Sequence, residues 1–266
     1  MAKNITTTKW IWITGASSGL GEALAYELAA QGANLVLSAR KLEELERVKS
    51  NCNQEVQILI QPLDIEMHHT IQDTVKEVLK KIPRINVLIN NAGISQRSLV
   101  KDTPLDVDKR LMNVNYFGTI ELTKAILPSM IAQQSGQIVV ISSLVGKIGS
   151  PLRSTYAASK HALHGFFDSL RAEVVRDQIH ITMICPGYIH TNVSKNALTA
   201  NGMPQNTTDS RTASGLSPES FAKRAVKAIQ KQRQEVSIGQ SETLVLYVKR
   251  FFPSLVNKIL SNVKVT

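Results

Sequence analysis

Short apolar segments alternate with helical patterns along the 266 residues of this chain, and this alternation limits the possible folds more than any other feature. The apolar segments, each predicted as a buried strand, are residues 10–13, 34–38, 56–60, 85–89, 138–141, 179–184 and 235–238. Helical patterns separate them, among them residues 73–81, 105–133, 155–176 and 218–232. Strands that alternate with helices pair in parallel through right-handed crossovers. The sequence therefore predicts an α/β fold with one doubly wound parallel sheet of about seven strands and helices on both faces.

No linker divides the pattern, so we expect a single domain over residues 1–266 with a core over residues 8–240. Residues 187–216 are rich in Asn, Thr, Ser, Ala and Gly and have little periodicity. A loop of this length is usually functional or disordered, and its place after the sixth strand suggests a lid over the site. A disordered insertion is the alternative.

The C-terminal tail, residues 243–266, mixes large apolar side chains with lysine and arginine. Its charges and Pro253 make it unsuited to span a membrane. We expect a helical tail that packs on its own domain or on a partner subunit. The alternative is a basic amphipathic segment that rests on an anionic lipid surface.

Composition narrows the class of partner and the compartment. The formal charge of +10 and the pI of about 9.6 favour anionic ligands or surfaces. With 5% aromatic residues and no basic run interleaved with aromatics, nucleic acid is a poor candidate.

Cys52 and Cys185 lie far apart and form no CxxC pair, so neither a disulfide framework nor a metal site is expected. With no secretory signal before Trp10, a cytoplasmic location is expected, with peripheral membrane contact as a possibility.

The segment TGASSGLG lies between the first strand and its helix. Its three glycines, Gly15, Gly19 and Gly21, allow a tight turn and close approach of a ligand to the backbone. The helix N-terminus behind them offers unpaired N–H groups to a pyrophosphate. The spacing GxxxGxG departs from the GxGxxG dinucleotide fingerprint, and a glycine-rich helix cap without a ligand is the alternative.

The end of the second strand indicates which nucleotide would bind. NAD-binding proteins of Rossmann type carry Asp or Glu there for the ribose hydroxyls, but this chain has Ser38, Ala39 and Arg40. Arg40 could pair with a 2′-phosphate, so the sequence predicts NADPH rather than NADH. An ordinary surface arginine is the alternative.

The segment YAASK places Tyr156 and Lys160 four residues apart, on one face of a helix. An ammonium beside a phenol favours the phenolate, so we expect the pKa of Tyr156 to be lowered toward the range useful for proton transfer. Ser143 ends the apolar run QIVVISS, at the carboxyl end of a predicted parallel strand, where open α/β sheets bind ligands. By itself the YxxxK spacing is equally typical of a core tyrosine beside a solvated lysine.

In combination these motifs resemble the short-chain dehydrogenase/reductase family, in its classical-length branch, over nearly all of residues 8–240. The resemblance also includes NNAG at residues 90–93, NVN at 113–115 and PGYIHT at 186–191. It implies a Rossmann-type fold, an oxidoreductase activity and a homodimer or homotetramer formed through the two long helices.

The resemblance also implies roles for individual residues. Tyr156 is the expected acid/base, Lys160 lowers its pKa and binds the nicotinamide ribose, Ser143 polarises the substrate oxygen, and Asn115 holds a water in the proton relay. Asp64 corresponds to the adenine-pocket aspartate. The full set of cofactor-binding residues expected is Gly15, Ser17, Ser18, Gly19, Leu20, Gly21, Ser38, Arg40, Asp64, Ile65, Asn91, Ala92, Gly93, Tyr156, Lys160, Pro186, Gly187, Ile189 and Thr191.

The segments 186–202 and 244–255 look most like a sub-branch of membrane-associated members that act on lipophilic carbonyls, although their N-terminal anchor is not found here. The leading hypothesis is an NADPH-dependent reductase of a hydrophobic carbonyl, or an alcohol dehydrogenase in reverse. The alternatives are a 3-oxoacyl reductase that docks an acidic acyl carrier protein, and an NADP-binding redox sensor without turnover. No metal is expected.

Overall fold

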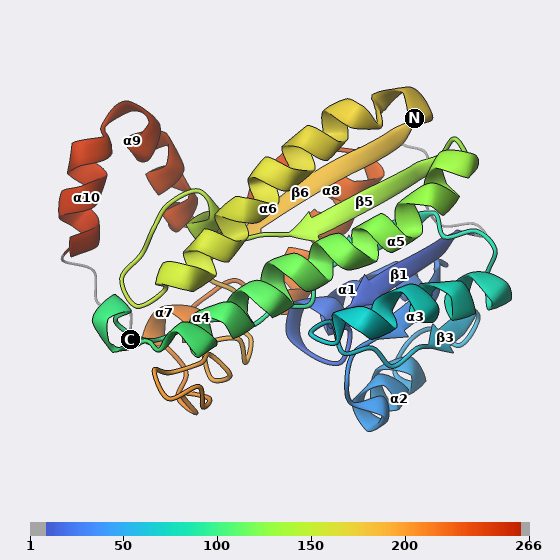
Figure 1. Cartoon of the computed structure of the whole chain (residues 1–266), viewed down its shortest axis with the longest axis horizontal. Coiled ribbons are helices and arrows are strands. Elements are labelled where there is room, and N and C mark those ends of the chain that lie inside the picture. The colour runs from blue at the N-terminus through green and yellow to red at the C-terminus, as the bar shows by residue number, and fades with distance from the viewer. Residues whose placement is uncertain (1–8, 262–266) are drawn as a thin grey trace.

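The computed structural model describes residues 9–261 and contains one parallel seven-stranded sheet in the order β3-β2-β1-β4-β5-β6-β7 (Figure 1). The predicted doubly wound α/β fold is confirmed. The strands are β1 (Trp10–Thr14), β2 (Asn34–Ser38), β3 (Ile58–Ile60), β4 (Val87–Asn90), β5 (Gly136–Ile141), β6 (Ile179–Pro186) and β7 (Glu235–Ile238). The order reverses between β1 and β4, and such a switch point opens a crevice at the carboxyl ends of the strands.

Helices cover both faces of the sheet. One face carries α1 (Gly19–Ala30), α2 (Leu42–Ser50) and α8 (Pro218–Gln230). The other carries α3 (His68–Lys81), α5 (Gly118–Ala132) and α6 (Ser154–Glu173), seen in front of the strands in Figure 1. The helix α4 (Leu105–Met112) precedes α5 and buries Val107 and Leu111 in a separate small cluster with Leu198. Side chains alternate between the two layers: Ile11 and Ile13 of β1 face α1, whereas Trp12 faces the other side. Each apolar strand is therefore buried on both sides, as the near-continuous apolar runs indicate.

The helix predicted over residues 105–133 is interrupted. Between α4 and α5 the backbone forms one π-helical turn, η2 (Asn113–Phe117). Directly after it, a Cβ on Gly118 would lie 2.2 Å from the Ile65 carbonyl oxygen, so only glycine permits this approach. The apolar pattern continues through the turn, which is why sequence periodicity does not reveal it; such turns are frequent at functional sites.

Residues 187–216 are not a disordered insertion. They include the short helix α7 (Ser210–Ala213), and isolated β-bridges join Leu198 to Gln96 and Ile189 to Leu216. The remaining short helices are η1 (Val100–Asp102), η3 (Leu144–Gly146) and η4 (Val175–Asp177).

The C-terminal part forms η5 (Ser241–Leu244), α9 (Val245–Phe251) and α10 (Pro253–Ser261). Figure 1 shows α9 and α10 as a hairpin that projects from the body. Lys249 donates a hydrogen bond to the Lys147 carbonyl (2.5 Å), and Val256 is buried, so the tail packs partly on its own chain. Within residues 9–261, no helix has the length and apolar character that a bilayer span requires. The outer parts of the predicted domain, residues 1–8 and 262–266, lie outside the described residues.

Candidate active site

A cavity of about 870 Å³ opens at the carboxyl ends of β1, β4, β5 and β6. It brings together residues that the sequence analysis selected from seven separate segments. Those that line it are Gly15, Ser17, Ser18, Gly19, Leu20, Ser38, Arg40, Asp64, Ile65, Asn91, Ala92, Gly93, Ser143, Tyr156, Lys160, Pro186, Gly187, Ile189 and Thr191. Two expected site residues, Gly21 and Asn115, do not line it.

The glycine turn between β1 and α1 has the shape that a phosphate cradle needs. Gly15 and Gly19 adopt φ of +64° and +57°, in the left-handed region that favours glycine. A Cβ on Gly15 would lie 2.9 Å from Ala92 Cα, and one on Gly21 only 2.2 Å from the Gly15 carbonyl oxygen. Gly21 thus lies behind the turn and lets α1 start close to it. The open N-terminus of α1 fits a pyrophosphate, because its first N–H groups are free of side-chain caps.

Thr14 and Asn91 hold the two sides of the crevice together. The Thr14 hydroxyl accepts hydrogen bonds from the backbone N–H groups of Asn91 (3.0 Å) and Ala92 (3.1 Å). The Asn91 amide donates to the carbonyl oxygens of Thr14 (2.9 Å) and Gly15 (3.2 Å). This network joins β1 to β4 at the switch point and fixes the glycine turn against the NNAG segment.

At the end of β2, Ser38 and Arg40 lie in different environments. Ser38 is buried, and its hydroxyl accepts a hydrogen bond from the Trp12 indole (2.8 Å). Arg40 is exposed on the cavity wall, and no described residue binds its side chain. Its guanidinium is therefore free to meet an anionic ligand.

Ser143, Tyr156 and Lys160 converge at the other end of the cavity, from the end of β5 and from α6. The Ser143 hydroxyl lies close enough to the Tyr156 phenol to lower its pKa, and it accepts a hydrogen bond from the Val145 N–H (3.3 Å). The Lys160 ammonium lies 5.9 Å from the centre of the Tyr156 ring and donates a hydrogen bond to the Ile141 carbonyl (2.8 Å). The expected convergence of a serine from the fifth strand, a phenol and an ammonium is present in the structure.

The expected direction of the Tyr156 pKa shift is wrong for this state of the protein. Burial raises the pKa of the Tyr156 phenol above its ordinary value, although the Ser143 hydroxyl and the charges of Arg153 and Arg97 oppose this effect. Burial also lowers the pKa of Lys160 to about 8. The lysine is held by the Ile141 carbonyl and is desolvated, so it does not dominate the field at the phenol.

Asn115 lies in the π turn, beneath the cavity and fully buried. Its amide donates to the Ile94 carbonyl (2.9 Å) and to the Ser159 hydroxyl (3.0 Å), and its side-chain oxygen accepts from the Ile94 N–H (2.8 Å). Its side chain thus ties the turn to α6 between Tyr156 and Lys160. This geometry supports a positioning role for the Asn115 side chain, and the water of the expected proton relay stays a prediction.

Sequence reasoning missed Gln96, which follows the NNAG segment. Its side chain is fully buried, and its oxygen accepts hydrogen bonds from the backbone N–H groups of Thr155 (2.9 Å) and Tyr156 (3.1 Å). These are orphan donors of the first turn of α6. Gln96 caps the helix from 60 residues away, and no local capping signal could have revealed it.

Glu242 of η5 is a second missed residue. Its carboxylate accepts a hydrogen bond from the Tyr188 N–H (3.0 Å) and occupies the space that a Cβ on Gly187 would need. The glycine in the expected nicotinamide segment is thereby explained by a contact from the C-terminal part of the chain.

His164 of α6 lies beside a cysteine and a carboxylate. It contacts the Ser142 hydroxyl (3.0 Å) and Cys185 Sγ (3.8 Å), with Glu235 nearby. Within residues 9–261, His164, Cys185 and Glu235 are the group whose ligand atoms lie near enough to hold a metal ion. The Lys147 ammonium pairs with Glu235, and its charge opposes a cation there.

Fold and cavity together define the class of protein. A doubly wound sheet with a glycine cradle at its switch point, facing a serine, a tyrosine and a lysine, is typical of nicotinamide-dependent oxidoreductases. The family model described as "short chain dehydrogenase" matches residues 9–202. The chain belongs to the short-chain dehydrogenase/reductase family, whose fold binds a nicotinamide cofactor.

Relatives from two animals match most of the chain. It is 47% identical over 237 residues to "Dehydrogenase/reductase SDR family protein 7-like" of Anopheles gambiae, covering 87% of this chain and 75% of that protein. It is 42% identical over 256 residues to "Dehydrogenase/reductase SDR family member 7B" of Mus musculus, covering 94% and 79% respectively.

A solved structure supports the fold. A short-chain dehydrogenase/reductase from Burkholderia phymatum, determined in complex with NAD, superposes with a TM-score of 0.83 at 21% identity, covering 95% of this chain and 96% of that one.

Proposed function

We propose that this protein is an NADPH-dependent oxidoreductase that moves a hydride between nicotinamide and a carbonyl or secondary alcohol of a hydrophobic, lipid-like substrate. The observation that carries the proposal is the single cavity shared by the glycine turn, Arg40 and the group Ser143, Tyr156 and Lys160. A redox sensor without turnover would need no proton donor at that place.

The residues that would hold the cofactor extend along the cavity. The glycine turn and the start of α1 suit its pyrophosphate, and Arg40 suits a 2′-phosphate through charge-assisted hydrogen bonds. Thr191 lies across from the turn, because a Cβ on Gly19 would lie 3.5 Å from the Thr191 side chain. The nicotinamide, when bound, supplies the hydride.

The chain's own groups manage charge and protons at the substrate oxygen. Ser143 and Tyr156 place two hydroxyl donors where negative charge would develop during reduction, and such fixed donors stabilise it. The Tyr156 hydroxyl then gives its proton to that oxygen, or takes one from an alcohol in reverse. Lys160, with a pKa of about 8, can replenish the phenol proton near neutral pH. Asn115 fixes α6 so that these groups keep their places.

Residues 187–216 support a hydrophobic substrate. Val193, Leu198 and Met203 from this segment line the cavity beside Asn192 and Pro204, and Met203 is 62% exposed at its mouth. Asn192 and Asn196 add polar groups to this wall, and small-molecule sites typically combine apolar lining with a small number of placed polar groups. We propose that this segment is the substrate lid.

The test is turnover of a panel of lipophilic ketones and secondary alcohols with NADPH and NADH, followed by nicotinamide absorbance. Tyr156→Phe should bind NADPH with nearly unchanged affinity and lose activity by about 100-fold or more. Arg40→Asp should reverse the preference for NADPH, whereas Lys49→Asp, an exposed charge change on α2 away from the cavity, should not. Substantial activity of Tyr156→Phe contradicts the proposed chemistry, and an unchanged preference of Arg40→Asp contradicts NADPH.

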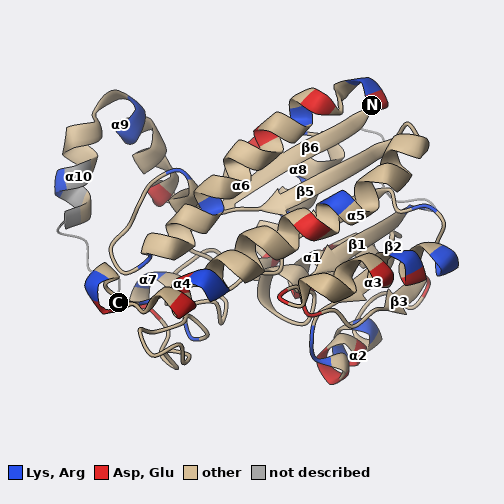
Figure 2. Ribbon diagram, in the orientation of Figure 1, with Lys and Arg blue, Asp and Glu red and all other residues tan. Residues whose placement is uncertain are grey.

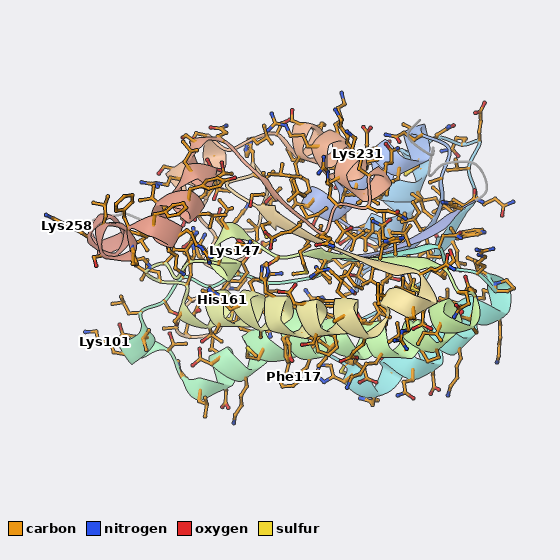
Figure 3. The ribbon with its side chains drawn as sticks, turned by 90° about the horizontal axis from the view of Figure 1, so that it is seen from above. Lys101, Phe117, Lys147, His161, Lys231 and Lys258 are labelled. Atoms are coloured by element: carbon orange, nitrogen blue, oxygen red, sulfur yellow. The ribbon has the colours of Figure 1, made fainter. Side chains whose placement is uncertain are left out.

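We also propose a peripheral membrane contact through the α9–α10 hairpin. Its large apolar side chains Tyr247, Phe251, Phe252 and Leu255, and Leu244 directly before it, are all at least 50% exposed. Residues 243–261 include lysine and arginine but no acidic residue (Figure 2), and Lys258 lies at the far end of the hairpin (Figure 3). Exposed apolar side chains beside positive charge suit an anionic lipid surface.

Sedimentation with vesicles of phosphatidylserine and phosphatidylcholine tests this contact. The triple variant Tyr247→Ser, Phe251→Ser, Phe252→Ser should remain in solution, whereas Val175→Ser, which removes an equally exposed side chain elsewhere, should sediment like the parent. Equal sedimentation of the triple variant and the parent contradicts the proposal. A lower molar mass of the triple variant in light scattering would instead assign the hairpin to a subunit interface.

A further inference from the structure

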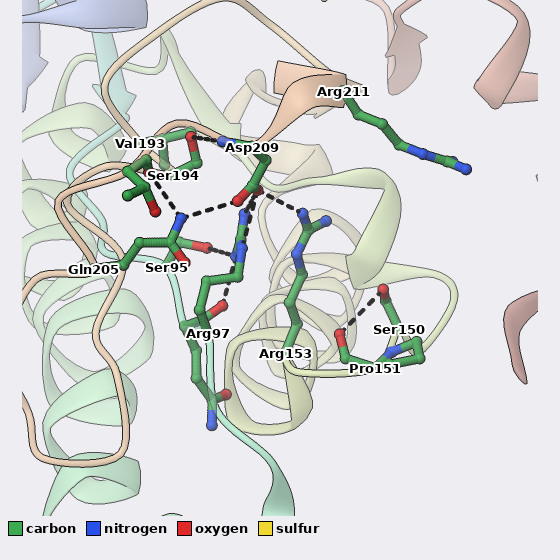
Figure 4. Close-up of polar contacts among 12 residues, drawn as sticks. Ser95, Arg97, Ser150, Pro151, Arg153, Val193, Ser194, Gln205, Asp209 and Arg211 are labelled. Atoms are coloured by element: carbon green, nitrogen blue, oxygen red, sulfur yellow. Dashed lines mark hydrogen bonds and ion pairs between the residues drawn. The ribbon is translucent and has the colours of Figure 1, made fainter. Parts of the chain in front are cut away.

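Two arginines and one aspartate form a buried cluster beside the cavity (Figure 4). Arg97 donates two hydrogen bonds to Asp209 Oδ2, one of them from Nε at 3.0 Å, and Arg153 reaches the same oxygen at 3.4 Å. The side chains of Arg97, Asp209 and Arg153 are 4%, 1% and 8% exposed. Charges this deeply buried are uncommon unless they are paired.

The pairing in this cluster is unequal. One carboxylate faces two guanidinium groups, so the cluster carries one excess positive charge. Asp209 is also held by Gln205 (2.9 Å), while Arg153 Nε is buried without a partner in the described part of the chain. An excess charge in a poorly solvated place acts strongly on its neighbours, because water does not screen it.

The cluster adjoins the backbone of Tyr156. Arg97 follows Gln96, whose side chain binds the Tyr156 N–H, and Arg153 lies directly before α6, three residues from Tyr156. Arg153 also lies over the Tyr188 ring, at 5.8 Å, in the segment that follows β6. The two arginines that carry the excess charge are thus adjacent in sequence to the start of α6 and to Gln96, which position Tyr156.

The lid is fastened to the same place. Leu198 exchanges two backbone hydrogen bonds with the segment around Gln96, at 2.8 and 2.9 Å. Asp209 lies 112 residues from Arg97 in sequence and joins the far end of the lid to it. The ion pair therefore links lid geometry with the surroundings of Tyr156.

We propose that Arg97, Arg153 and Asp209 are positioning residues whose excess positive charge favours the phenolate form of Tyr156 while Asp209 clamps the lid to α6. The inference rests on the proposed role of Tyr156 as acid/base. The charges of Arg153 and Arg97 act against the burial that raises the Tyr156 pKa, which agrees with this role. Burial by itself raises the pKa of the Asp209 carboxyl, but the hydrogen bonds from Arg97 and Gln205 and the charges of the two arginines together bring it below the ordinary value, so the pair stays charged at neutral pH.

Other charged or titratable groups also face this end of α6, and the test must hold them constant. Lys160 lies one turn along the helix, Asp108 of α4 accepts a hydrogen bond from Thr155, and the Arg211 guanidinium lies 5.9 Å from the centre of the Tyr188 ring. The groups to be left unchanged are Asp108, Lys160, Tyr188 and, except as a control, Arg211.

The decisive experiment uses two substitutions that break the same ion pair with opposite change of charge. Arg97→Gln removes a positive charge and should raise the Tyr156 pKa, whereas Asp209→Asn removes a negative charge and should lower it, each by about one unit. The double variant keeps the single excess positive charge of the parent cluster, on Arg153, so its Tyr156 pKa should return close to that of the parent. The pKa is read by NMR of Cζ-labelled tyrosine in the full chain, with Tyr156→Phe used to assign the signal.

Two further variants keep the test decisive. Arg153→Gln removes a positive charge but leaves the Arg97–Asp209 pair intact. It should therefore raise the Tyr156 pKa, as Arg97→Gln does, and it gives this test even if the Arg97→Gln variant folds poorly. Arg211→Gln removes an exposed charge near Tyr188 and should produce no shift, because water screens it. Shifts of Arg97→Gln and Asp209→Asn in the same direction, or no shift in either, overturn the proposal.

The outcome separates this inference from the proposed function. If opposite pKa shifts are found but Tyr156→Phe retains activity, the cluster acts on a phenol that is not the acid/base. If Tyr156→Phe is inactive and no shifts are found, the proposed function stands and the cluster is only structural. In an active enzyme, the rate of alcohol oxidation should rise with pH as Tyr156 loses its proton. The pH of this rise should be lower for Asp209→Asn and higher for Arg153→Gln than for the parent.

Discussion

Replacing Gln96 by leucine should destabilise the start of α6 and slow catalysis together. Leucine has nearly the same size but no acceptor, so the N–H groups of Thr155 and Tyr156 lose their partner. Each buried donor left unsatisfied costs about 1–3 kcal/mol. Both lie at a helix start that water can partly reach, which favours the lower part of that range. We therefore expect a loss of about 2–4 kcal/mol in the free energy of unfolding.

The assay is urea unfolding followed by tryptophan fluorescence, since Trp10 and Trp12 lie in β1, an interior strand of the sheet. For a chain of this size the loss corresponds to a fall of roughly 5–15 °C in Tm. Gln96→Glu keeps the acceptor oxygens beside the helix N-terminus and should lose less stability. Gln72→Leu on α3, an exposed glutamine, is the matched control and should stay within about 0.5 kcal/mol of the parent.

In an active enzyme, Gln96→Leu should also lower kcat more than it raises KM for NADPH. The reason is that Gln96 positions Tyr156 and does not line the cavity. Stability of Gln96→Leu equal to that of the Gln72→Leu control would refute the reasoning, because the two N–H groups would then have found another partner without cost.

Three further predictions follow from burial and close packing. Gly21→Ala should cost about 1–3 kcal/mol or more in urea unfolding, because its Cβ would lie 2.2 Å from a carbonyl oxygen, whereas Gly149→Ala has open space and should not. Burial raises the pKa of Cys52 to about 11 and that of Cys185 to about 12, so iodoacetamide at pH 8 should label neither thiol before unfolding; rapid native labelling would contradict this. The pKa of Asp209 is lower in the folded than in the unfolded chain, so its stabilisation is complete above about pH 4 and is lost as pH falls through the folded value. Asp209→Asn should therefore unfold with a flatter dependence on acidic pH, and an equally steep one would argue against the ion pair.

Most of the fold could be predicted from local sequence patterns. Apolar runs and glycine turns predict the seven strands because a parallel sheet buried on both faces requires such runs. The π turn at Asn113–Phe117 was not predictable in this way, since one extra residue in a helix does not disturb its apolar pattern enough.

The same division holds for the site. The residues of the glycine turn, Arg40, Ser143, Tyr156 and Lys160 were recognised from short motifs, because each motif has its own backbone or chemical requirement. The Gln96 cap and the Arg97–Asp209 pair join residues 60 and 112 positions apart, and no local pattern predicts such contacts. The direction of the Tyr156 pKa shift also required the folded structure. A neighbouring lysine four residues away is visible in the sequence, but the desolvation that outweighs it depends on how the whole chain packs around the phenol.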